Sequence, residues 1–340
     1  MRNFVRKVFK LYSNDKAAFS AIVIVLLFAF IAAAAPILAS KLPWLVISNN
    51  SGIEMPTSPL LHAIIHPRKR IILERTDYRK LASEEKISAI FPPVPFSPYE
   101  TNLDNFLDAP SFSRFGHPLG SDSLGRDVAA RLMHGATNSM LVGLIAVGLA
   151  FIIGVLIGAM AGYFGGWTDL ALSRFIEIVI CFPTLILIMA VLALIKPSLV
   201  TIMVVIGLTG WTGIARVMRG EFLKRRGGDF VLAARLTGAS HVRLILKHIL
   251  PNSLAPLIVM AAFDIAGAVL LESSLSFLGI GVPAPEPSWG DILKNSQEYP
   301  DIAWWLVVFP GTCIFLVVVA FNFLGDWLRK ALNPRERAAS

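Results

Sequence analysis

Six long apolar runs constrain this chain more than any other feature of its sequence. They cover residues of about 17–39, 140–161, 170–194, 199–215, 253–271 and 304–324. Each run has roughly the 17 to 25 residues that an α-helix needs to cross the hydrocarbon core of a bilayer. Because a segment in lipid must satisfy its backbone hydrogen bonds internally, we expect an all-α polytopic membrane protein with about six transmembrane helices.

The composition excludes several other classes of protein. The 340-residue chain is 55% hydrophobic and 16% charged, with a mean hydropathy of +0.66, which is too apolar for an ordinary soluble domain. A net charge of +8 would suit a nucleic-acid-binding protein, but the basic residues cluster beside the apolar runs, where they act as topology signals. We therefore expect no nucleic acid partner. Cys181 and Cys313 lie inside apolar runs, so they predict neither a disulfide nor a cysteine-based metal site.

The basic residues predict the topology. They precede the first run at Arg2, Arg6, Lys7, Lys10 and Lys16, are dense from 216 to 247, and follow the last run at Arg329, Lys330, Arg335 and Arg337. The positive-inside rule places these three regions, and thus both termini, in the cytoplasm. A cleavable signal peptide is the alternative for the first run, but that run is longer than the usual signal-peptide core.

The topology divides the chain into four parts. Residues 1–39 form a cytoplasmic N-terminus and the first transmembrane helix, and 40–138 form an external segment that we interpret as a cap or a docking surface for a solute receptor. Residues 139–329 form a five-helix core with a cytoplasmic loop at 216–252, and 330–340 form a cytoplasmic tail. His62 and His66 in the external segment have a helical i, i+4 spacing, but with no third ligand nearby they predict no metal site.

The loop between the fourth and fifth runs favours helix. We expect one helix over about 221–236, a left-handed stop at Gly238, and a second short helix over about 240–249 that ends before Pro251. Its small side chains would form a shallow surface for a partner, and its basic side chains would face phospholipid or acidic protein. These residues are Ala233, Ala234 and Ala239, and Arg235, Arg243 and Lys247.

A glycine-rich polar motif precedes the second run and reads PLGSDSLGRDV from 118 to 128. Gly120 and Gly125 permit tight turns, and Asp122 is expected to cap the helix that follows. Arg126 and Asp127 are expected to hold the helix entrance by ion pairs. A structural turn and direct contact with substrate remain equally open for this motif.

Polar and small residues inside the runs predict further contacts. Gly154 and Gly158 form a GxxxG motif that indicates close helix packing, and Arg174 and Glu177 stand i, i+3 apart and are expected to pair. Asp264 is the most isolated acid in the apolar runs, so it is a candidate for the translocation pathway, with a helix–helix hydrogen bond as the alternative.

The segment after the fifth run is a candidate gate. Glu272 begins a stretch that includes Phe277, and Gly279 and Gly281 would break the helix and form an external re-entrant region. An ordinary loop with an interfacial Trp289 is the alternative.

These motifs resemble those of the permease subunits of binding-protein-dependent ABC importers. The cytoplasmic loop resembles the EAA signature of that family, although Leu232 stands at the family's glutamate position. The EAA-like positions are Ala233, Ala234, Gly238, Leu250 and Pro251. The motif at 118–139 resembles that of C-type dipeptide and oligopeptide permeases, with Ser121 and Ala130 as departures, and 272–290 resembles a second segment of the same family.

The resemblance covers about 118–335 and implies the type I ABC importer transmembrane fold. It implies a multi-pass subunit of the bacterial inner membrane that imports di- or oligopeptides by alternating access. The implied partners are a homologous second permease, two ATP-binding-cassette ATPase subunits, an external solute-binding protein and the lipid bilayer. ATP and Mg²⁺ would be bound by the ATPase subunits, and we expect no cofactor or catalytic residue in this chain, whose sequence carries no Walker phosphate loop.

Two alternatives remain open. Nickel permeases share these signatures, so the sequence does not separate peptide from nickel. A proton-coupled secondary transporter would use Asp264, Glu177 and Glu272 as a relay. Such transporters often carry internal repeats, and none is evident here.

Overall fold

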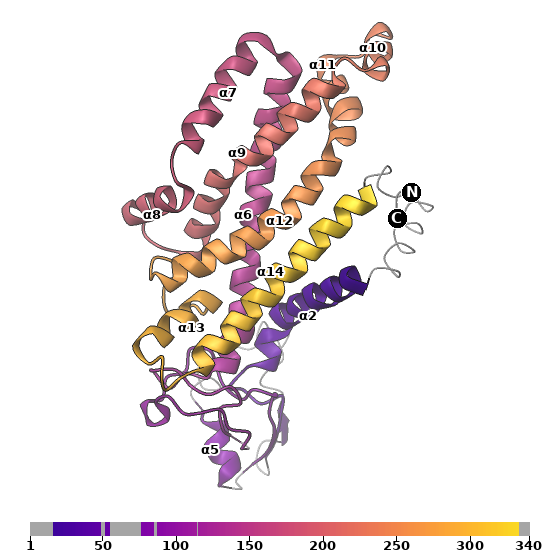
Figure 1. The fold of residues 1–340 in the computed structure, drawn as a ribbon. Helices are drawn as coiled ribbons and strands as arrows, with labels where there is room; N and C mark the ends of the chain where they lie inside the picture. Colours follow the sequence, from indigo (N-terminus) through magenta and orange to yellow (C-terminus); the bar gives the residue numbers. More distant parts are fainter. Residues whose placement is uncertain (1–15, 49–51, 55–75, 85–86, 114, 333–340) are drawn as a thin grey trace. The chain divides into compact units, whose positions relative to one another are not determined.

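A computed structural model describes residues 16–48, 52–54, 76–84, 87–113 and 115–332 (Figure 1). The chain divides into two compact units. One consists of Met1–Leu26, Leu141–Leu275 and Phe315–Ser340, and the other of Leu27–Met140 and Ser276–Ile314. His62, His66 and the outermost basic residues of both termini lie outside the described residues.

Among the described residues, five helices are long and apolar enough to cross a membrane. They are Lys16–Leu38 (α2), Val128–Phe164 (α6), Leu199–Arg225 (α9), His241–Phe277 and Trp305–Leu332 (α14) (Figure 1). The fourth of them comprises α11 (His241–Arg243), a π-helical turn (Leu244–Ile249) and α12 (Leu250–Phe277). A bent pair of helices raises the number of spans to six if the pair counts as one span. The expected helical membrane protein is therefore confirmed.

The third predicted span is bent instead of straight. Helix α7 (Gly166–Ile180) and α8 (Thr184–Leu194) meet at an angle of 81°. Pro183 occupies the N-cap of α8. Proline lacks a backbone N–H and disfavours helical conformation in the residue before it, so the chain turns at Phe182. The single helix that the sequence predicts over 170–194 is therefore wrong.

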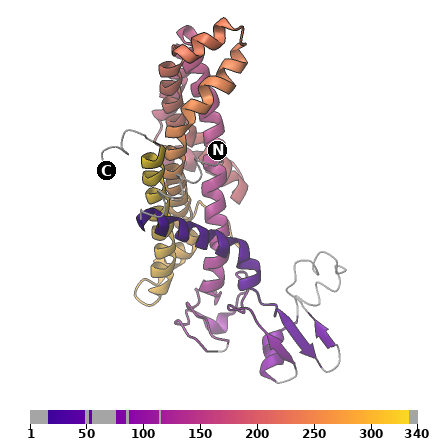
Figure 2. The same cartoon turned by 90° about the vertical axis from the view of Figure 1, so that its right-hand side faces the viewer.

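The segment between α2 and α6 contains a small sheet that the sequence analysis missed. Strand β1 (Leu45–Ser48) lies between β2 (Gly52–Glu54) and β3 (Ser88–Ile90), and both pairings are antiparallel. In this unit α5 (Tyr78–Ser83) lies beside the sheet (Figure 2). Strands of three or four residues are too short to show a clear alternation of apolar and polar side chains, which explains the omission.

Short elements complete this unit. A 3₁₀ turn (Leu103–Asn105) precedes α6, while α13 (Trp289–Asn295) and a second 3₁₀ turn (Ser296–Glu298) lie between α12 and α14. A buried cluster of Leu42, Val46 and Tyr78 supports the sheet.

Glycines let α6 approach α9 closely. A methyl group at Gly154 would lie 2.7 Å from Cβ of Ile214, and one at Gly158 would collide with the carbonyl oxygen of Ala215. The predicted role of this GxxxG pair in helix packing is confirmed. Gly162 extends the row, since a methyl group there would lie 2.6 Å from the carbonyl oxygen of Arg219.

We expect Gly158→Ala to destabilise the protein by about 1 to 3 kcal/mol, because the added methyl must push α6 and α9 apart. Gly148→Ala is the matched control on the same helix, since a methyl group there meets no atom within 4 Å. The control should be neutral or stabilise by up to about 1 kcal/mol through helix propensity. Unfolding of the purified chain in a denaturing detergent series measures both, and equal effects would contradict the packing role.

Candidate functional site

The loop between α9 and α12 contains a short separate helix. Helix α9 continues to Arg225, and α10 (Asp229–Leu236) starts anew after Gly227 and Gly228 (Figure 1). Two successive glycines have low helix propensity, so the helix breaks there. The single helix that the sequence predicts over about 221–236 is wrong.

Gly238 ends α10 in a Schellman motif. The Ala239 N–H donates to the Ala234 carbonyl at 3.1 Å, and the Gly238 N–H donates to the Arg235 carbonyl at 3.0 Å. Gly238 has φ +81°, a conformation that residues with a Cβ adopt at a cost. The predicted left-handed stop is confirmed.

The second short helix does not end before Pro251. Instead α11 runs through the π-helical turn into α12 without a break. The Leu250 N–H donates five residues back, to the Ile245 carbonyl, and Pro251 follows directly. The Asn252 side-chain amide donates to the His248 carbonyl at 2.7 Å. Pro251 has no backbone N–H to donate, and the wider π-helical turn before it lets the helix continue past the proline.

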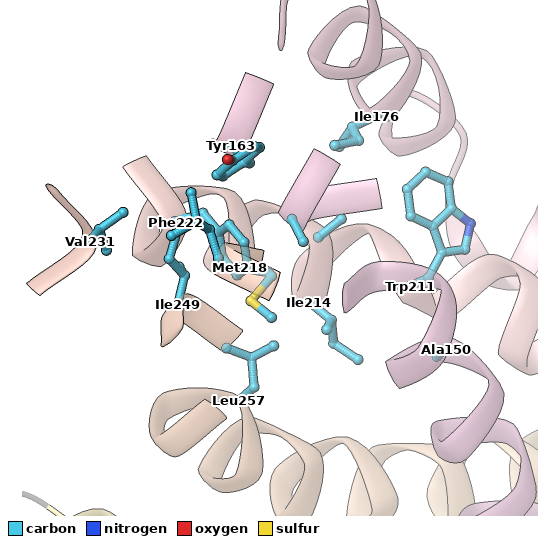
Figure 3. Close-up of a cluster of buried hydrophobic side chains, with 13 residues drawn as sticks. Ala150, Tyr163, Ile176, Trp211, Ile214, Met218, Phe222, Val231, Ile249 and Leu257 are labelled. Atoms are coloured by element: carbon cyan, nitrogen blue, oxygen red, sulfur yellow. The ribbon is translucent and has the colours of Figure 1, made fainter. Parts of the chain in front are cut away.

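One face of the loop is buried. Val231, Leu244 and Ile249 belong to a hydrophobic cluster that also holds Met218 and Phe222 of α9 (Figure 3). Each has at most 1% of its surface exposed, and burying such a side chain contributes about 1.5 to 3 kcal/mol. The loop is therefore fixed to the helix bundle along its inner face.

The EAA-like positions divide between the two faces. Ala234 and Leu250 pack against the cluster, as does Ala239, whereas Ala233 and Pro251 are exposed. Ala234 and Ala239 are half-buried, because the Schellman motif brings both against the cluster, and Ala233 is exposed. The role of the three alanines in docking a partner stays a prediction.

The outer face carries large apolar side chains instead. We call this set the apolar loop surface; it consists of Phe230, Leu232, Leu236, Val242 and Leu246, all exposed. Leu236 has 89% of its surface exposed. Arg235, Arg243 and Lys247 are also exposed. The i, i+4 spacings of 232 with 236 and of 242 with 246 are the signal that could have identified this surface.

Polar contacts tie the loop to α6 and α7. The Tyr163 hydroxyl lies 2.6 Å from Nδ1 of His241. Arg226 donates to the Gly162 carbonyl at 3.3 Å. The Arg219 guanidinium donates from Nε and Nη2 to the two carboxylate oxygens of Asp169. Thus the ends of α6 and α9 and the start of α7 hold the base of the loop.

The glycine-rich motif before α6 folds as two tight turns. Gly120 has φ +81° and Gly125 has φ +66°, as the sequence predicts. Asp122 does not cap α6. Its Oδ1 accepts from the backbone N–H of Leu124 at 2.9 Å and of Arg126 at 3.0 Å, within the second turn.

Asp127 caps α6 in place of Asp122. Its Oδ1 accepts from the Ala130 N–H at 2.7 Å, and its Oδ2 contacts Nδ1 of His117 at 2.8 Å. Arg126 pairs with Asp122, with 2.7 Å between Nε and Oδ2. The expected ion pair of Arg126 at the helix entrance is present, with Asp122 as its partner, and Asp127 contacts the imidazole of His117.

Arg131 is the buried centre of this polar cluster. Only 1% of its side chain is exposed, and its Nη2 lies 2.6 Å from Oδ2 of Asp291 on α13. Its Nη1 donates to the Pro98 carbonyl at 2.9 Å, and its Nε lies 3.7 Å from Oδ2 of Asp122. The sequence analysis did not predict these partners, and the one closest in space, Asp291, lies 160 residues away in sequence.

The candidate pathway residues lie along and just after α12. Asp264 lies in the middle of α12, and its buried Oδ2 has no hydrogen-bond partner among the described residues. Glu272 is fully buried inside α12, so it does not begin the external segment as predicted. Asp264 and Glu272 are separated by about 12 Å along the helix axis, too far for direct proton transfer between them.

Gly279 breaks the helix as predicted. Phe277 is the last residue of α12, and Gly279 has φ +82°, with its N–H donating to the Ser276 carbonyl at 2.9 Å. The gate role of these residues stays a prediction. Among the described residues no group of three or more His, Cys, Asp or Glu could hold a metal ion.

Comparison with known proteins identifies the family. A family model described as the binding-protein-dependent transport system inner membrane component matches residues 154–338. The chain is 41% identical over 252 residues to the dipeptide transport system permease protein DppC of Alkalihalophilus pseudofirmus, covering 74% of this chain and 82% of that one. The chain belongs to this permease family.

A second relative of this permease agrees with that assignment. It is 37% identical over 243 residues to the oligopeptide transport system permease protein OppC of Haemophilus influenzae, covering 72% of this chain and 78% of that one. By its family and these two relatives, the permease is a multi-pass component of an inner-membrane transport system. Among solved structures, the chain is similar to a chain of the inward-facing MetNI methionine ABC transporter at 19% identity, covering 59% of this chain and 96% of that one, with a TM-score of 0.48.

We expect Arg131→Met to destabilise the permease by about 3 to 5 kcal/mol, because it leaves the carboxylates of Asp122 and Asp291 without their shared cation. Arg174→Met is the matched control, since Arg174 pairs with Glu177 on the surface, with 69% of its side chain exposed. The control should cost less than about 1 kcal/mol. Thermal unfolding in mild detergent distinguishes the two, and similar costs would show that the buried network is dispensable.

Gly238→Val should loosen the loop, because a β-branched residue at φ +81° costs roughly 1 to 2 kcal/mol locally. Gly238→Asn is the control, since asparagine tolerates this conformation. Hydrogen–deuterium exchange over 229–249 should be faster than wild type in the valine variant and close to wild type in the asparagine variant. Equal protection in both variants would remove the conformational explanation for this glycine.

Proposed function

We propose that this permease imports di- or oligopeptides, and that it is coupled to partner ATPase subunits through the loop at 230–252. The single observation that carries the coupling role is the apolar loop surface. Its five large apolar side chains are exposed on a loop whose opposite face is already buried. Large apolar side chains exposed together on one short loop are typical of an interaction site.

The chemistry of the loop surface fits a protein partner. Phe230, Leu236 and Val242 supply apolar contact area, and the exposed basic residues Arg235 and Arg243 supply charge complementarity to an acidic cleft. The dense basic residues around the loop support a position on the cytoplasmic side, together with both termini, by the positive-inside rule. That is the side on which ATP is available.

The remaining parts of the proposal follow from family membership. A homologous second permease, two ATP-binding-cassette subunits that bind ATP and Mg²⁺, and an external solute-binding protein would complete the importer in a bacterial inner membrane. ATP-driven closure of the ATPases would move the loops and open the pathway alternately to each side. Asp264, with its unpartnered buried oxygen, is the candidate pathway residue.

Peptide is preferred to nickel as the substrate. The relatives described above are named for dipeptide and oligopeptide transport, at 41% and 37% identity. This similarity supports peptide import.

The test is affinity purification of the tagged chain from native membranes in mild detergent. We expect a second permease and Walker-motif subunits to co-purify with vanadate-sensitive ATPase activity. Leu236→Glu should abolish recovery of the ATPase subunits, since it places a charge in the docking surface. Because Leu236 is 89% exposed, this substitution should change the free energy of unfolding of the chain by no more than about 0.5 kcal/mol.

Phe112→Glu is the matched control for Leu236→Glu. Phe112 is 88% exposed, and it lies between α2 and α6, outside the loop. This variant should retain the ATPase subunits. A chain that purifies alone and carries proton-coupled flux in liposomes would overturn the importer proposal. Retention of the ATPases by Leu236→Glu would remove the coupling role from this surface.

A further inference from the structure

The loop between α12 and α13 is held at two points. At its start, the Val282 N–H donates to the Ser276 hydroxyl at 3.1 Å, which folds the chain back onto the end of α12. Near its end, the Asn138 side-chain amide donates to the Pro287 carbonyl at 2.8 Å. All of these residues belong to one compact unit of the chain. We call residues 278–286, which lie before the second point, the gate loop, since they directly follow the end of α12 in the candidate gate.

The residues just after the gate loop are fixed by largely buried contacts. Trp289 is fully buried, and its Nε1 donates to the Leu132 carbonyl at 3.1 Å. Its ring lies edge-on to that of Phe28, with 5.4 Å between the centroids. Asp291 accepts from the buried Arg131 at 2.6 Å. Hydrogen bonds shielded from water are strengthened by their surroundings, so this end of the loop stays in place.

An exposed hydrogen bond holds the gate loop itself against the external segment. The Tyr99 hydroxyl donates to Oε2 of Glu286 at 3.1 Å, and Tyr99 is 45% exposed. Burial raises the pKa of the Tyr99 hydroxyl, and the negative charge of Glu286 raises it further, so the hydroxyl keeps its proton and remains the donor. Since water competes for both partners, this bond opens more readily than the buried contacts of Arg131 and Trp289.

Tyr99 is itself held in place by its neighbours in sequence. The Pro98 carbonyl accepts from Nη1 of Arg131 at 2.9 Å, and Glu100 pairs with Arg79 of α5. The chain on both sides of Tyr99 is thus fixed before its hydroxyl reaches the loop. The side chain is therefore a pre-organised donor that loses little conformational freedom when it bonds.

We propose that Tyr99 is a positioning residue for the candidate gate, and that its hydrogen bond to Glu286 keeps the gate loop in one position against the external segment. When this bond opens, residues 278–286 are free to move, while Trp289 and Asp291 keep the far end fixed. The external segment thereby takes part in the gate. The gate role rests on the proposed function, whereas the position of the loop does not.

The test is hydrogen–deuterium exchange of the purified full-length chain in lipid nanodiscs. Tyr99→Phe keeps the ring and removes the hydroxyl, so it should speed exchange over 278–286 by about two- to tenfold, the factor that an exposed hydrogen bond contributes. Exchange over 289–293 should stay at the wild-type rate, because the buried contacts remain. Tyr299→Phe is the matched control and should change neither region. The Tyr299 ring packs edge-on to Phe106 at 5.6 Å, and its hydroxyl has no hydrogen-bond partner among the described residues.

Variants of the acceptor show whether the hydrogen bond itself acts. Glu286→Ala should speed exchange as much as Tyr99→Phe does. The double variant should be no faster than either single variant, because both changes remove the same bond. Glu286→Gln keeps a side-chain oxygen that can accept from the Tyr99 hydroxyl, so its exchange should stay close to the wild-type rate.

A transport assay tests whether the loop acts as a gate. In cells that take up a labelled dipeptide through this permease, Tyr99→Phe should lower the maximal uptake rate by about two- to tenfold and leave KM within about twofold, because the residue acts on the gate and not on bound substrate. Unchanged uptake by this variant would overturn the gate role. A wild-type chain that takes up no peptide would overturn the proposed function, and the exchange rates would then still decide whether Tyr99 holds the loop.

Three exchange results would overturn the assignment of Tyr99. They are an unchanged rate over 278–286 in Tyr99→Phe, an equally faster rate over 289–293 in the same variant, and a rate in Glu286→Gln as fast as that in Glu286→Ala. The second result would mean that Tyr99 supports the whole region and does not position the gate loop in particular.

Discussion

The close approach of α6 and α9 is the contact on which the loop region depends. Gly154, Gly158 and Gly162 leave α6 without side chains at successive turns of its contact with α9. At the ends of these helices, Tyr163 and Phe222 enter the cluster that buries the inner face of the loop. With the helices farther apart, that cluster would open and Tyr163 could not reach His241. The glycines of α6 therefore determine how the loop that follows α9 packs.

Length and hydropathy were sufficient to predict most of the helices, because lipid leaves a chain few alternatives to helix. Helix α2, expected over about 17–39, spans Lys16–Leu38. The turns at Gly238 and Gly279 were also predictable, since glycine adopts a positive φ at little cost. Pro183 is present in the sequence as a possible site of a bend, but the apolar run continues on both sides of it, so hydropathy alone predicted one straight helix.

Contacts between distant parts of the chain could not be predicted. Arg131 pairs with Asp291, and nothing local to either residue indicates the other. The choice of Asp127 over Asp122 as the cap depends on where α6 starts, which one apolar run does not define. Likewise, the outward direction of Ala233 and the inward direction of Ala234 depend on the cluster beneath them. Spacing identified the candidate residues, whereas packing decided which way each one faces.

The attachment of the loop on two sides has a mechanical consequence. Its inner face is bound through Val231 to the same cluster that holds Phe222 of α9 and Leu257 of α12. The loop therefore packs against both helices at once, and its outer face cannot shift without moving this buried cluster. A displacement of α10 would therefore be passed to α9 and α12 through the same buried side chains.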